Sequence, residues 1–480
     1  MNDERYVMKE EFKIAWRNLW RNRRRTLITS ASIFFAVFFA VIMRSYQLGS
    51  YDHMINNFIE SFTGYLQVQH IKYQDNPFID NSFDYHDSIA SAISRIDNVV
   101  SVTPHLESFT LASSGTQTKG VSVIAIDPEK EKNFSDPESK LVRFRITDET
   151  VKCLKESASA TDDMLEKVKK NMGRAYSSST RLELEMGLTR EDNEDYLAEI
   201  LRCASVSNGY LTKDDHGILV SDRLAGYLKV GVGDSVILMG QGYHGGSANG
   251  IFPVRGIIKI PSPEIDNKLI IMTIPTAQAF FDAENKITSL VVNLTDKSNR
   301  TIKTAKSRIN ALIQDKNTVA RSWYELNPIL YQQIQGDSQT GMAMLGILYF
   351  IIFFGIFGTV LMMVSERKRE FGVLVAIGMQ KKRLKKIVTI EMMMLGAIGV
   401  VCGLSASAPL IMYFFYKPIL LRGDLGNMME DWGWDAVMPT AWFGPYFYWQ
   451  AVVVAFMVAL ATIYPMRRIS RLKEIEALKS

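Results

Sequence analysis

The stretch GMAMLGILYFIIFFGIFGTVLMMV, residues 341–364, decides the fold because it contains no charged side chain. A helix of about 20 apolar residues crosses the roughly 30 Å hydrocarbon core of a bilayer. Core helices of soluble proteins rarely stay uncharged over such a length. The sequence therefore predicts a transmembrane helix at 341–364.

Three further apolar blocks lie outward from this stretch, at 27–48, 388–416 and 446–464. The first block has an alternative interpretation as a cleavable signal peptide. A long charged segment precedes it and no clear small-x-small cleavage site follows it, which favours an uncleaved anchor. We therefore expect four transmembrane helices, with a large polar region between the first and the second.

Basic residues predict how these helices are oriented, because Lys and Arg concentrate on the cytoplasmic side of membranes. They cluster at 17–25, 367–386 and 467–473, whereas the loop 417–445 holds few of them. Both termini and the central loop are therefore expected in the cytoplasm, and 49–340 outside it. The net charge of +4 is modest, so nucleic-acid binding gains no support.

These expectations divide the chain into successive parts. They are a cytoplasmic amphipathic helix at 1–26, a first span at 27–48, an extracytoplasmic domain at 49–340, a second span at 341–364, a cytoplasmic loop with a coupling helix at 365–387, a third span at 388–416, a short outer loop at 417–445, a fourth span at 446–464 and a cytoplasmic tail at 465–480.

Alternating strand patterns dominate the extracytoplasmic domain, with helical patterns between them. The predicted strands are 65–71, 121–126, 217–220, 235–239, 252–260, 269–273 and 289–294, and the predicted helices are 86–96, 222–228, 274–282 and 298–315. A charged stretch at about 148–208, poor in β-branched residues, predicts a helical insertion. The expected fold is thus a membrane protein of four transmembrane helices with a large α+β domain between the first two.

Two helical extensions are expected to join this domain to the membrane, at 49–62 and at 329–340. The first carries apolar residues at spacings of 3, 4, 3 and 4, which is typical of a coiled-coil seam. The seam residues are Leu48, Tyr51, Ile55, Phe58 and Phe62. They predict a rigid stalk close to any cargo; the alternative is that they pack on the domain itself.

Residues for catalysis or for metal or nucleotide binding are not recognisable. There is no GxxxxGK[ST] phosphate loop, and the six histidines are scattered without ligand spacing. A GxGxxG match at 240–245 precedes a further strand pattern rather than a helix, so it predicts a hairpin loop. Cys153 and Cys203 either form a disulfide or are two unrelated thiols. We therefore predict no catalytic, cofactor-binding or metal site.

The segment ERKREFGVLVAIGMQKKRLKKIVTIEMMMLGAIG, residues 366–399, closely resembles the signature of FtsX-like permeases. That signature is an ER-x-x-E-[IF]-G-x-L-x-A-[IL]-G core, a basic helix, and a glutamate that opens the next membrane helix. The core residues here are Glu366, Arg367, Glu370, Phe371, Gly372, Leu374, Ala376, Ile377 and Gly378, and the glutamate is Glu391. Val375 stands where many members carry arginine, so no ionic contact is expected there. The segments 15–26 and 465–478 resemble the two ends of the same family.

The resemblance implies a permease subunit of an FtsX/MacB-like ABC transporter rather than an enzyme. ATP and Mg²⁺ would bind to a separate ATPase dimer. This dimer would dock on the core residues of the signature, with Leu374 and Ile377 as anchors. A second permease copy, identical or related, would complete the complex in the lipid bilayer. Closure of the ATPase would tilt the membrane helices and move the outer domain, which is mechanotransmission.

In layout the chain most resembles the lipoprotein-releasing LolC/LolE type of this superfamily. The resemblance therefore implies extraction of lipoproteins from a bacterial inner membrane, with a MacB-like periplasmic domain. One alternative is MacB-like efflux of a peptide, antibiotic or haem-like compound, with a periplasmic adaptor as partner. Another is an FtsX-like regulator of a cell-wall hydrolase. The sequence leaves open the cargo, the pairing of permeases and the role of the insertion.

Overall fold

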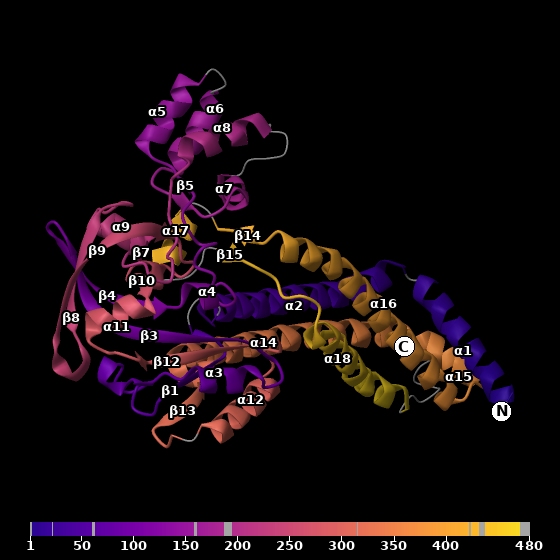
Figure 1. Ribbon diagram of the computed structural model, residues 1–480. Helices are drawn as coiled ribbons and strands as arrows, with labels where there is room; N and C mark the ends of the chain where they lie inside the picture. Colours follow the sequence, from indigo (N-terminus) through magenta and orange to yellow (C-terminus); the bar gives the residue numbers. More distant parts are fainter. Residues whose placement is uncertain are drawn as a thin grey trace. The chain divides into compact units, whose positions relative to one another are not determined.

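The structure is a computed structural model that describes residues 2–21, 23–59, 63–157, 161–186, 194–313, 315–421, 424–431 and 437–470. Its chain forms two compact units. The membrane unit comprises Met1–His53, Gln332–Ile419 and Val437–Ser480, and the sheet unit comprises Met54–Tyr331 and Leu420–Ala436. Each unit is described by itself below, with the elements labelled in Figure 1.

Long helices build the membrane unit. They are α1 (Asn2–Arg21), α2 (Arg23–Phe58), α14 (Pro328–Glu366), α15 (Lys368–Ala376), α16 (Lys381–Tyr416) and α18 (Pro445–Ser470). Four of them, α2, α14, α16 and α18, are long and apolar enough to cross a bilayer, which confirms the four helices expected from the sequence. The boundary between the two units falls within both α2 and α14.

Several helix bounds differ from the predicted divisions. Residues 23–26 belong to α2 rather than to the N-terminal helix, and residue 22 lies outside the described residues. Helix α16 already begins at Lys381, and α18 continues to Ser470. Helix α2 is described to Phe58, and residues 60–62 of the predicted first stalk lie outside the described residues. Charged residues can extend a helix beyond the lipid, and hydropathy detects only the apolar part. The predicted limits of the lipid-embedded parts therefore stay predictions.

Small residues let the membrane helices approach one another closely. A side chain at Gly399 of α16 would come within 2.6 Å of Ile33 on α2, and one at Gly403 within 2.8 Å of Val37. Gly396 faces Val458 of α18 in the same way. Such glycine stripes replace the hydrophobic effect as a source of close packing in membranes, because van der Waals contact is gained where backbones meet.

A nine-stranded sheet forms the centre of the sheet unit. In spatial order its strands are β13 (Thr318–Ser322), β1 (Leu66–His70), β12 (Ser289–Leu294), β3 (Val99–Ser114), β4 (Gln117–Ile126), β10 (Leu269–Thr273), β7 (Ile218–Ser221), β9 (Ser247–Ile258) and β8 (Ser235–Gln241). Strand β3 also pairs with β8, so β3, β4, β10, β7, β9 and β8 close into a ring. Apolar side chains such as Leu106, Val123 and Leu238 fill the interior.

The other end of the sheet is an open four-stranded layer of β13, β1, β12 and β3. The helices α3 (Asp87–Ser94) and α12 (Asn299–Leu312) contact each other and pack on this layer. A small two-stranded ribbon, β2 (Phe83–Asp84) with β11 (Lys286–Ile287), lies beside α3 in the chain. The predicted helices at 86–96 and 298–315 thus cover an open layer, whereas the ring encloses its own core.

Strand β3 was missing from the sequence prediction, as was β13. The sequence of β3, VVSVTPHLESFTLASS, contains a proline and six serines or threonines among its sixteen residues, so it lacks a clean alternation. It is a strand because three different partners bind it along its length: β12, β4 and β8. Non-local pairing therefore overrides a weak local preference.

The insertion is helical, as predicted, and has its own apolar core. Its helices are α5 (Asp148–Glu156), α6 (Asp162–Lys170), α7 (Ser179–Met186) and α8 (Glu194–Ala204), with a short ribbon of β5 (Phe144–Arg145) and β6 (Ala175–Tyr176) at its base. Leu154, Val168 and Ile200 are buried in this core. Cys153 of α5 and Cys203 of α8 form a disulfide, which settles the alternative left open by the sequence.

The GxGxxG match forms a hairpin, as expected. Strands β8 and β9 pair antiparallel, and a tight turn at Tyr243–Gly245 joins them. The backbone N–H of Gly242 donates to the carbonyl of Gly246 at 2.7 Å. No helix follows the turn, so it offers no helix N-terminus to a pyrophosphate.

Candidate functional site

The family signature forms a short helix between two membrane helices. Helix α14 ends at Glu366, and Arg367 interrupts the helical path before α15 begins. At the other end, Gly378 has φ +106°, a conformation that only glycine adopts without strain. The backbone N–H of Met379 closes this turn on the carbonyl of Leu374 at 3.0 Å. Gly378 thus ends α15 and redirects the chain into α16.

A buried ion pair attaches the start of α15 to α16. Arg367 donates from Nη1 to both carboxylate oxygens of Glu391, at 2.9 and 2.8 Å. Glu391 is only 3% exposed, and the Arg367 guanidinium also lies 5.3 Å from the ring centre of the buried Phe371. Both carboxylate oxygens accept from this one nitrogen, and such charge-assisted hydrogen bonds are roughly twice as strong as neutral ones. The carboxylate of Glu391 therefore points into the protein rather than toward water.

The ion pair continues outward to the N-terminal helix. Arg367 Nε also donates to Glu370 at 3.3 Å, and Glu370 accepts from Arg21 at the end of α1. Burial acts to raise the pKa of Glu370, but the hydrogen bonds and charges of Arg21 and Arg367 outweigh it and hold this pKa below its usual range. The order Arg21, Glu370, Arg367, Glu391 thus alternates in charge and connects α1, α15 and α16.

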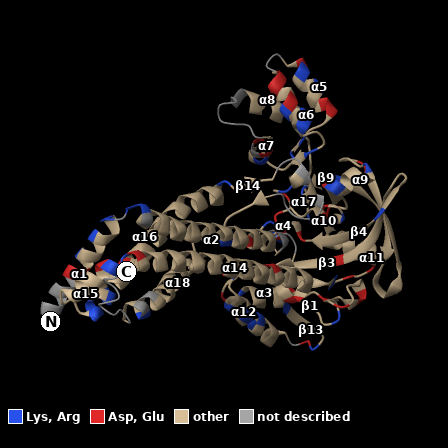
Figure 2. Ribbon diagram, turned by 180° about the vertical axis from the view of Figure 1, so that it is seen from behind, with Lys and Arg blue, Asp and Glu red and all other residues tan. Residues whose placement is uncertain are grey.

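Helix α1 is amphipathic, as the sequence predicted. Ala15 and Leu19 are buried, whereas Trp16 and Trp20 are exposed and contact each other at a centroid distance of 5.9 Å. The nearly buried Glu11 pairs with Lys386 of α16 at 2.8 Å. Figure 2 shows charged positions gathered on α1, α15 and the start of α16, while α2 and α14 are largely uncharged along their length.

The predicted coupling residues divide into an inner and an outer set. Arg367, Phe371 and Gly372 face the protein and are wholly or largely buried. Glu366, Glu370, Leu374, Ala376, Ile377 and Gly378 are exposed. Ile377 is 80% exposed and Leu374 is 37% exposed, so both aliphatic side chains are available for contact. One face of α15 is therefore held against the protein by Arg367 and Phe371, and the other face, its apolar front, exposes Leu374 and Ile377.

Val375 takes the position at which many members of the family carry arginine. Its side chain is half-buried and packs against the apolar core of the membrane unit. The expectation that no ionic contact forms there agrees with this packing. Dispersion contacts replace any charge at that point of α15.

The predicted stalk residues lie in different surroundings. Leu48 and Tyr51 are half-buried in the membrane unit, and Ile55 is half-buried in the sheet unit. The side chain of Phe58 and the whole of Phe62 lie outside the described residues. Tyr51 is not purely an apolar seam residue, since its hydroxyl bonds to Asp337 of α14.

A polar junction therefore ties α2 to α14 within the membrane unit. Gln47 Nε2 donates to the Tyr51 hydroxyl at 2.8 Å and to the Asp337 carbonyl at 3.1 Å. Arg44 donates to Gln47 Oε1 at 2.6 Å. Gly341 leaves room for the Gln47 side chain, because any Cβ there would overlap it. Sequence reasoning missed this junction, although polar residues beside an apolar block are a usable signal.

Four long apolar helices, a charged helical loop between the second and third, and a large α/β domain between the first and second define a polytopic membrane permease. Residues 342–473 match the family described as FtsX-like permease C-terminal.

Curated relatives point in the same direction. The chain is 23% identical over 301 residues to the lipoprotein-releasing system transmembrane protein LolC of Xylella fastidiosa strain 9a5c, a match that covers 60% of this chain and 70% of the relative. It is 24% identical over 237 residues to LolC of Neisseria meningitidis serogroup B, covering 48% and 55%. The resemblance to FtsX-like permeases, LolC proteins among them, is therefore confirmed.

Two solved structures resemble parts of the fold. One is the periplasmic region of MacB from Actinobacillus actinomycetemcomitans, with a TM-score of 0.30, 13% identity, and 58% of this chain and 95% of that chain covered. The other is the extracellular domain of the noncanonic ABC-type transporter YknZ from Gram-positive bacteria, with a TM-score of 0.27, 11% identity, and 54% and 99% covered. At TM-scores this low, neither structure bears on the function of this chain.

Proposed function

We propose that this chain is the permease subunit of a lipoprotein-releasing transporter driven by a separate ATPase dimer. The observation that carries the proposal is the two-sided character of α15: an apolar front that faces solvent and a back held by a buried, bidentate ion pair. A docking element needs both properties, since the partner needs apolar anchors and the force it applies needs a rigid attachment.

The anchors of this docking element are Leu374 and Ile377. They are three residues apart and therefore share one face of the short helix. Amphipathic helices bind grooves through such i, i+3 anchors. ATP and Mg²⁺ would be held by the ATPase, and this chain would contribute contact surface only.

The ion pairs determine which helices move when α15 is displaced. Arg367–Glu391 passes it to α16, and Arg21–Glu370 passes it to α1. Helix α14 leads directly into the loop that carries α15, and its 39 residues correspond to about 58 Å at 1.5 Å per residue. A continuous helix of this length transmits tilt from the cytoplasmic end to the other end without a hinge.

Release of lipoproteins, rather than another cargo, is supported by the LolC relatives, whose name states that activity. A second permease copy, identical or related, and a bacterial inner membrane complete the proposal. The large α/β domain would then lie in the periplasm.

The proposal is tested by purifying the chain from native membranes and identifying the proteins that accompany it. An ABC ATPase is expected with the wild type and is expected to be lost with Leu374→Asp combined with Ile377→Asp. Ile329→Asp is the matched control, because Ile329 is 81% exposed at the opposite end of α14. Retention of the ATPase by the double variant would disprove the docking assignment. Lipid-modified proteins are the expected third component, and an adaptor or a cell-wall hydrolase in their place would overturn the cargo assignment.

A further inference from the structure

The sheet unit contains a pocket that the proposed transport function does not use. Its volume is about 500 Å³, and it lies where α3 and α12 cover the open sheet layer. Its lining residues come from β1, β2, β13, α3 and the end of α12; they are Val68, Phe83, Asp84, His86, Ser88, Ile89, Ala92, Leu312, Ile313, Asp315 and Thr318. This volume falls within the range of about 300–1,000 Å³ that encloses small-molecule ligands in proteins.

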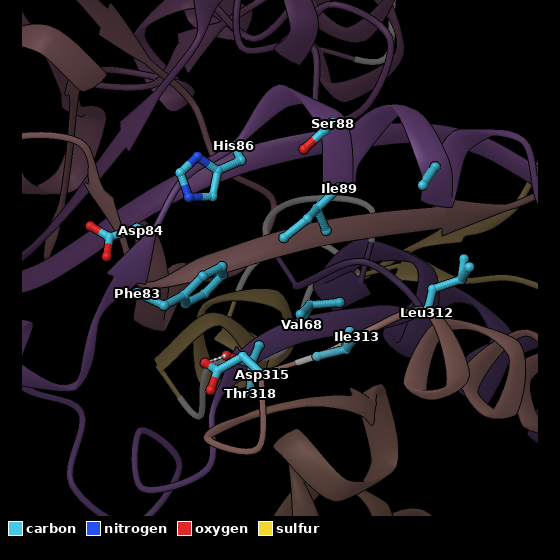
Figure 3. Close-up of a pocket in the computed structure, with 11 residues that line it drawn as sticks. Val68, Phe83, Asp84, His86, Ser88, Ile89, Leu312, Ile313, Asp315 and Thr318 are labelled. Carbon is cyan, nitrogen blue, oxygen red and sulfur yellow. Dashed lines mark hydrogen bonds between the residues drawn. The ribbon is translucent and has the colours of Figure 1, made fainter.

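The lining is divided between an apolar and a polar end. Figure 3 shows Leu312 at one end and Asp84 and His86 toward the other, with Ile89 and Val68 between them. Asp315 lies beside Thr318 on the lower side of the same view. A ligand that satisfies both ends has an apolar body and a polar head.

The charge of the polar end comes from Asp315. Its carboxylate accepts from the Asn317 backbone N–H at 3.0 Å and from the Thr318 hydroxyl at 2.7 Å. These hydrogen bonds hold the pKa of Asp315 below its usual range, so the group stays ionised at neutral pH. In the part of the chain that the structure describes, no Lys or Arg forms an ion pair with it.

Asp84 contributes less charge to the pocket than Asp315 does. It pairs with Lys286 across the β2–β11 ribbon at 2.8 Å, so its charge is already balanced. The Asp84 carboxylate can still accept a hydrogen bond from a ligand in the pocket. The polar end therefore combines the acidic Asp315, on which the nearby His70 also acts electrostatically, with the polar side chains of His86 and Ser88. The Asp315 carboxylate is complementary to a cationic head group.

An added peptide strand is excluded as the occupant of the neighbouring sheet edge. The outer N–H groups of the edge strand β13 are all bonded: Thr318 to the Asp315 carbonyl at 3.3 Å, Ala320 to Asn310 Oδ1 at 2.8 Å, and Ser322 to Glu325 Oε2 at 2.8 Å. Side chains thus cap this edge in the way that native proteins protect exposed strands. The proposed ligand site is therefore the cavity and not the β13 edge.

We propose that this pocket binds a small cationic amphiphile, with the apolar body between α3 and α12 and an ammonium or guanidinium group beside Asp315. The site belongs to the sheet unit alone and does not depend on an ATPase or on a lipoprotein cargo. Its failure would leave the proposed transport function untouched.

The test is calorimetric titration of the full chain in lipid nanodiscs with octylammonium chloride and, separately, sodium octanoate. Heats from empty nanodiscs are subtracted to remove partition into lipid. We expect octylammonium to bind more tightly than octanoate. Asp315→Asn should weaken octylammonium about two- to fivefold, as expected for a solvent-exposed charge pair, and should abolish the preference for the cation.

Asp296→Asn is the matched control. Asp296 is also exposed, also accepts from a backbone N–H and a threonine hydroxyl, and precedes α12 instead of following it. This variant should bind both compounds as the wild type does. Equal affinity of the wild type for cation and anion would overturn the charge assignment.

Two further variants test the apolar end. Ala92→Trp and Leu312→Trp each fill the apolar end from a different helix. Each should reduce octylammonium binding about tenfold or more, because the indole takes the space of the ligand's buried methylene groups. Leu312 is 48% exposed, so this second variant keeps the test valid if Ala92→Trp does not fold. Binding that is undiminished in both folded variants, or absent in the wild type, would disprove the site.

Discussion

A buried ion pair occurs in each of the two units, and the two pairs differ in their chemistry. In the membrane unit Arg367 meets Glu391 between two helices. In the sheet unit His105 of β3 meets Glu131 at 3.0 Å, and both side chains are almost fully enclosed. Arginine keeps its charge at all accessible pH values, whereas histidine can lose it.

The surroundings of the two pairs also differ. Arg367 and Glu391 belong to a series of charges that reaches the surface at Glu370 and Arg21. Glu131 instead accepts from the Ser135 hydroxyl at 2.5 Å, and His105 is further flanked by Glu107 at 3.8 Å, inside the fold. The Arg367–Glu391 pair thus joins separate helices to a surface on which a partner can act. The His105–Glu131 pair instead fixes elements of a single domain.

The largest effect is expected from breaking the arginine pair. Glu391→Gln leaves the Arg367 charge without its buried partner and with only the half-exposed Glu370 beside it, which costs about 3–5 kcal/mol of unfolding free energy. Denaturant titration of the protein in detergent micelles measures this loss. The double variant Arg367→Gln with Glu391→Gln should lose less than either single variant, because no charge remains unpaired. Additive losses would show that the two residues do not act as a pair.

The histidine pair should make the stability of the sheet unit depend on pH. Burial acts to lower the pKa of His105, but the charges and hydrogen bonds of Glu131 and Glu107 together outweigh it and raise this pKa to about 10. The protonated form is therefore favoured by folding, so its contribution is complete below about pH 6.5 and is lost as pH rises through about 10. Thermal unfolding should occur at progressively lower temperature over this range.

The variant His105→Gln should remove most of this slope, whereas His70→Gln, at the more exposed end of β1, should keep it. A wild type whose unfolding temperature stays constant from pH 6.5 to 10 would contradict the assignment. The Arg367–Glu391 pair should give no such pH dependence of the unfolding temperature, because arginine stays protonated over this range.

The smallest effect on stability is expected at the outer end of the charge series. Arg21 and Glu370 are about half exposed, so Arg21→Gln should cost no more than about 1 kcal/mol. Denaturant titration beside Glu391→Gln gives the comparison directly. If Arg21→Gln proved as costly as Glu391→Gln, the charges would form one cooperative unit rather than a buried pair with an exposed extension.

The sequence by itself determined the class of this protein and most of its architecture. The uncharged stretch 341–364 and three similar blocks are sufficient for four membrane helices, because no water in the lipid interior can satisfy a free backbone. The signature from Glu366 to Glu391 indicated the resemblance to FtsX-like permeases, and the i, i+3 spacing of Leu374 and Ile377 placed them on one face of a short helix.

Only the tertiary structure decided which charges meet. Arg367 and Glu391 are 24 positions apart, Arg21 and Glu370 are separated by 349, and no local pattern connects either pair. The same holds for β3, which is a strand because of distant partners, and for the pocket beside Asp315, whose walls come from five elements. Periodicity and hydropathy describe neighbours along the chain, whereas ion pairs, sheet closure and cavities depend on contacts between residues that folding brings together.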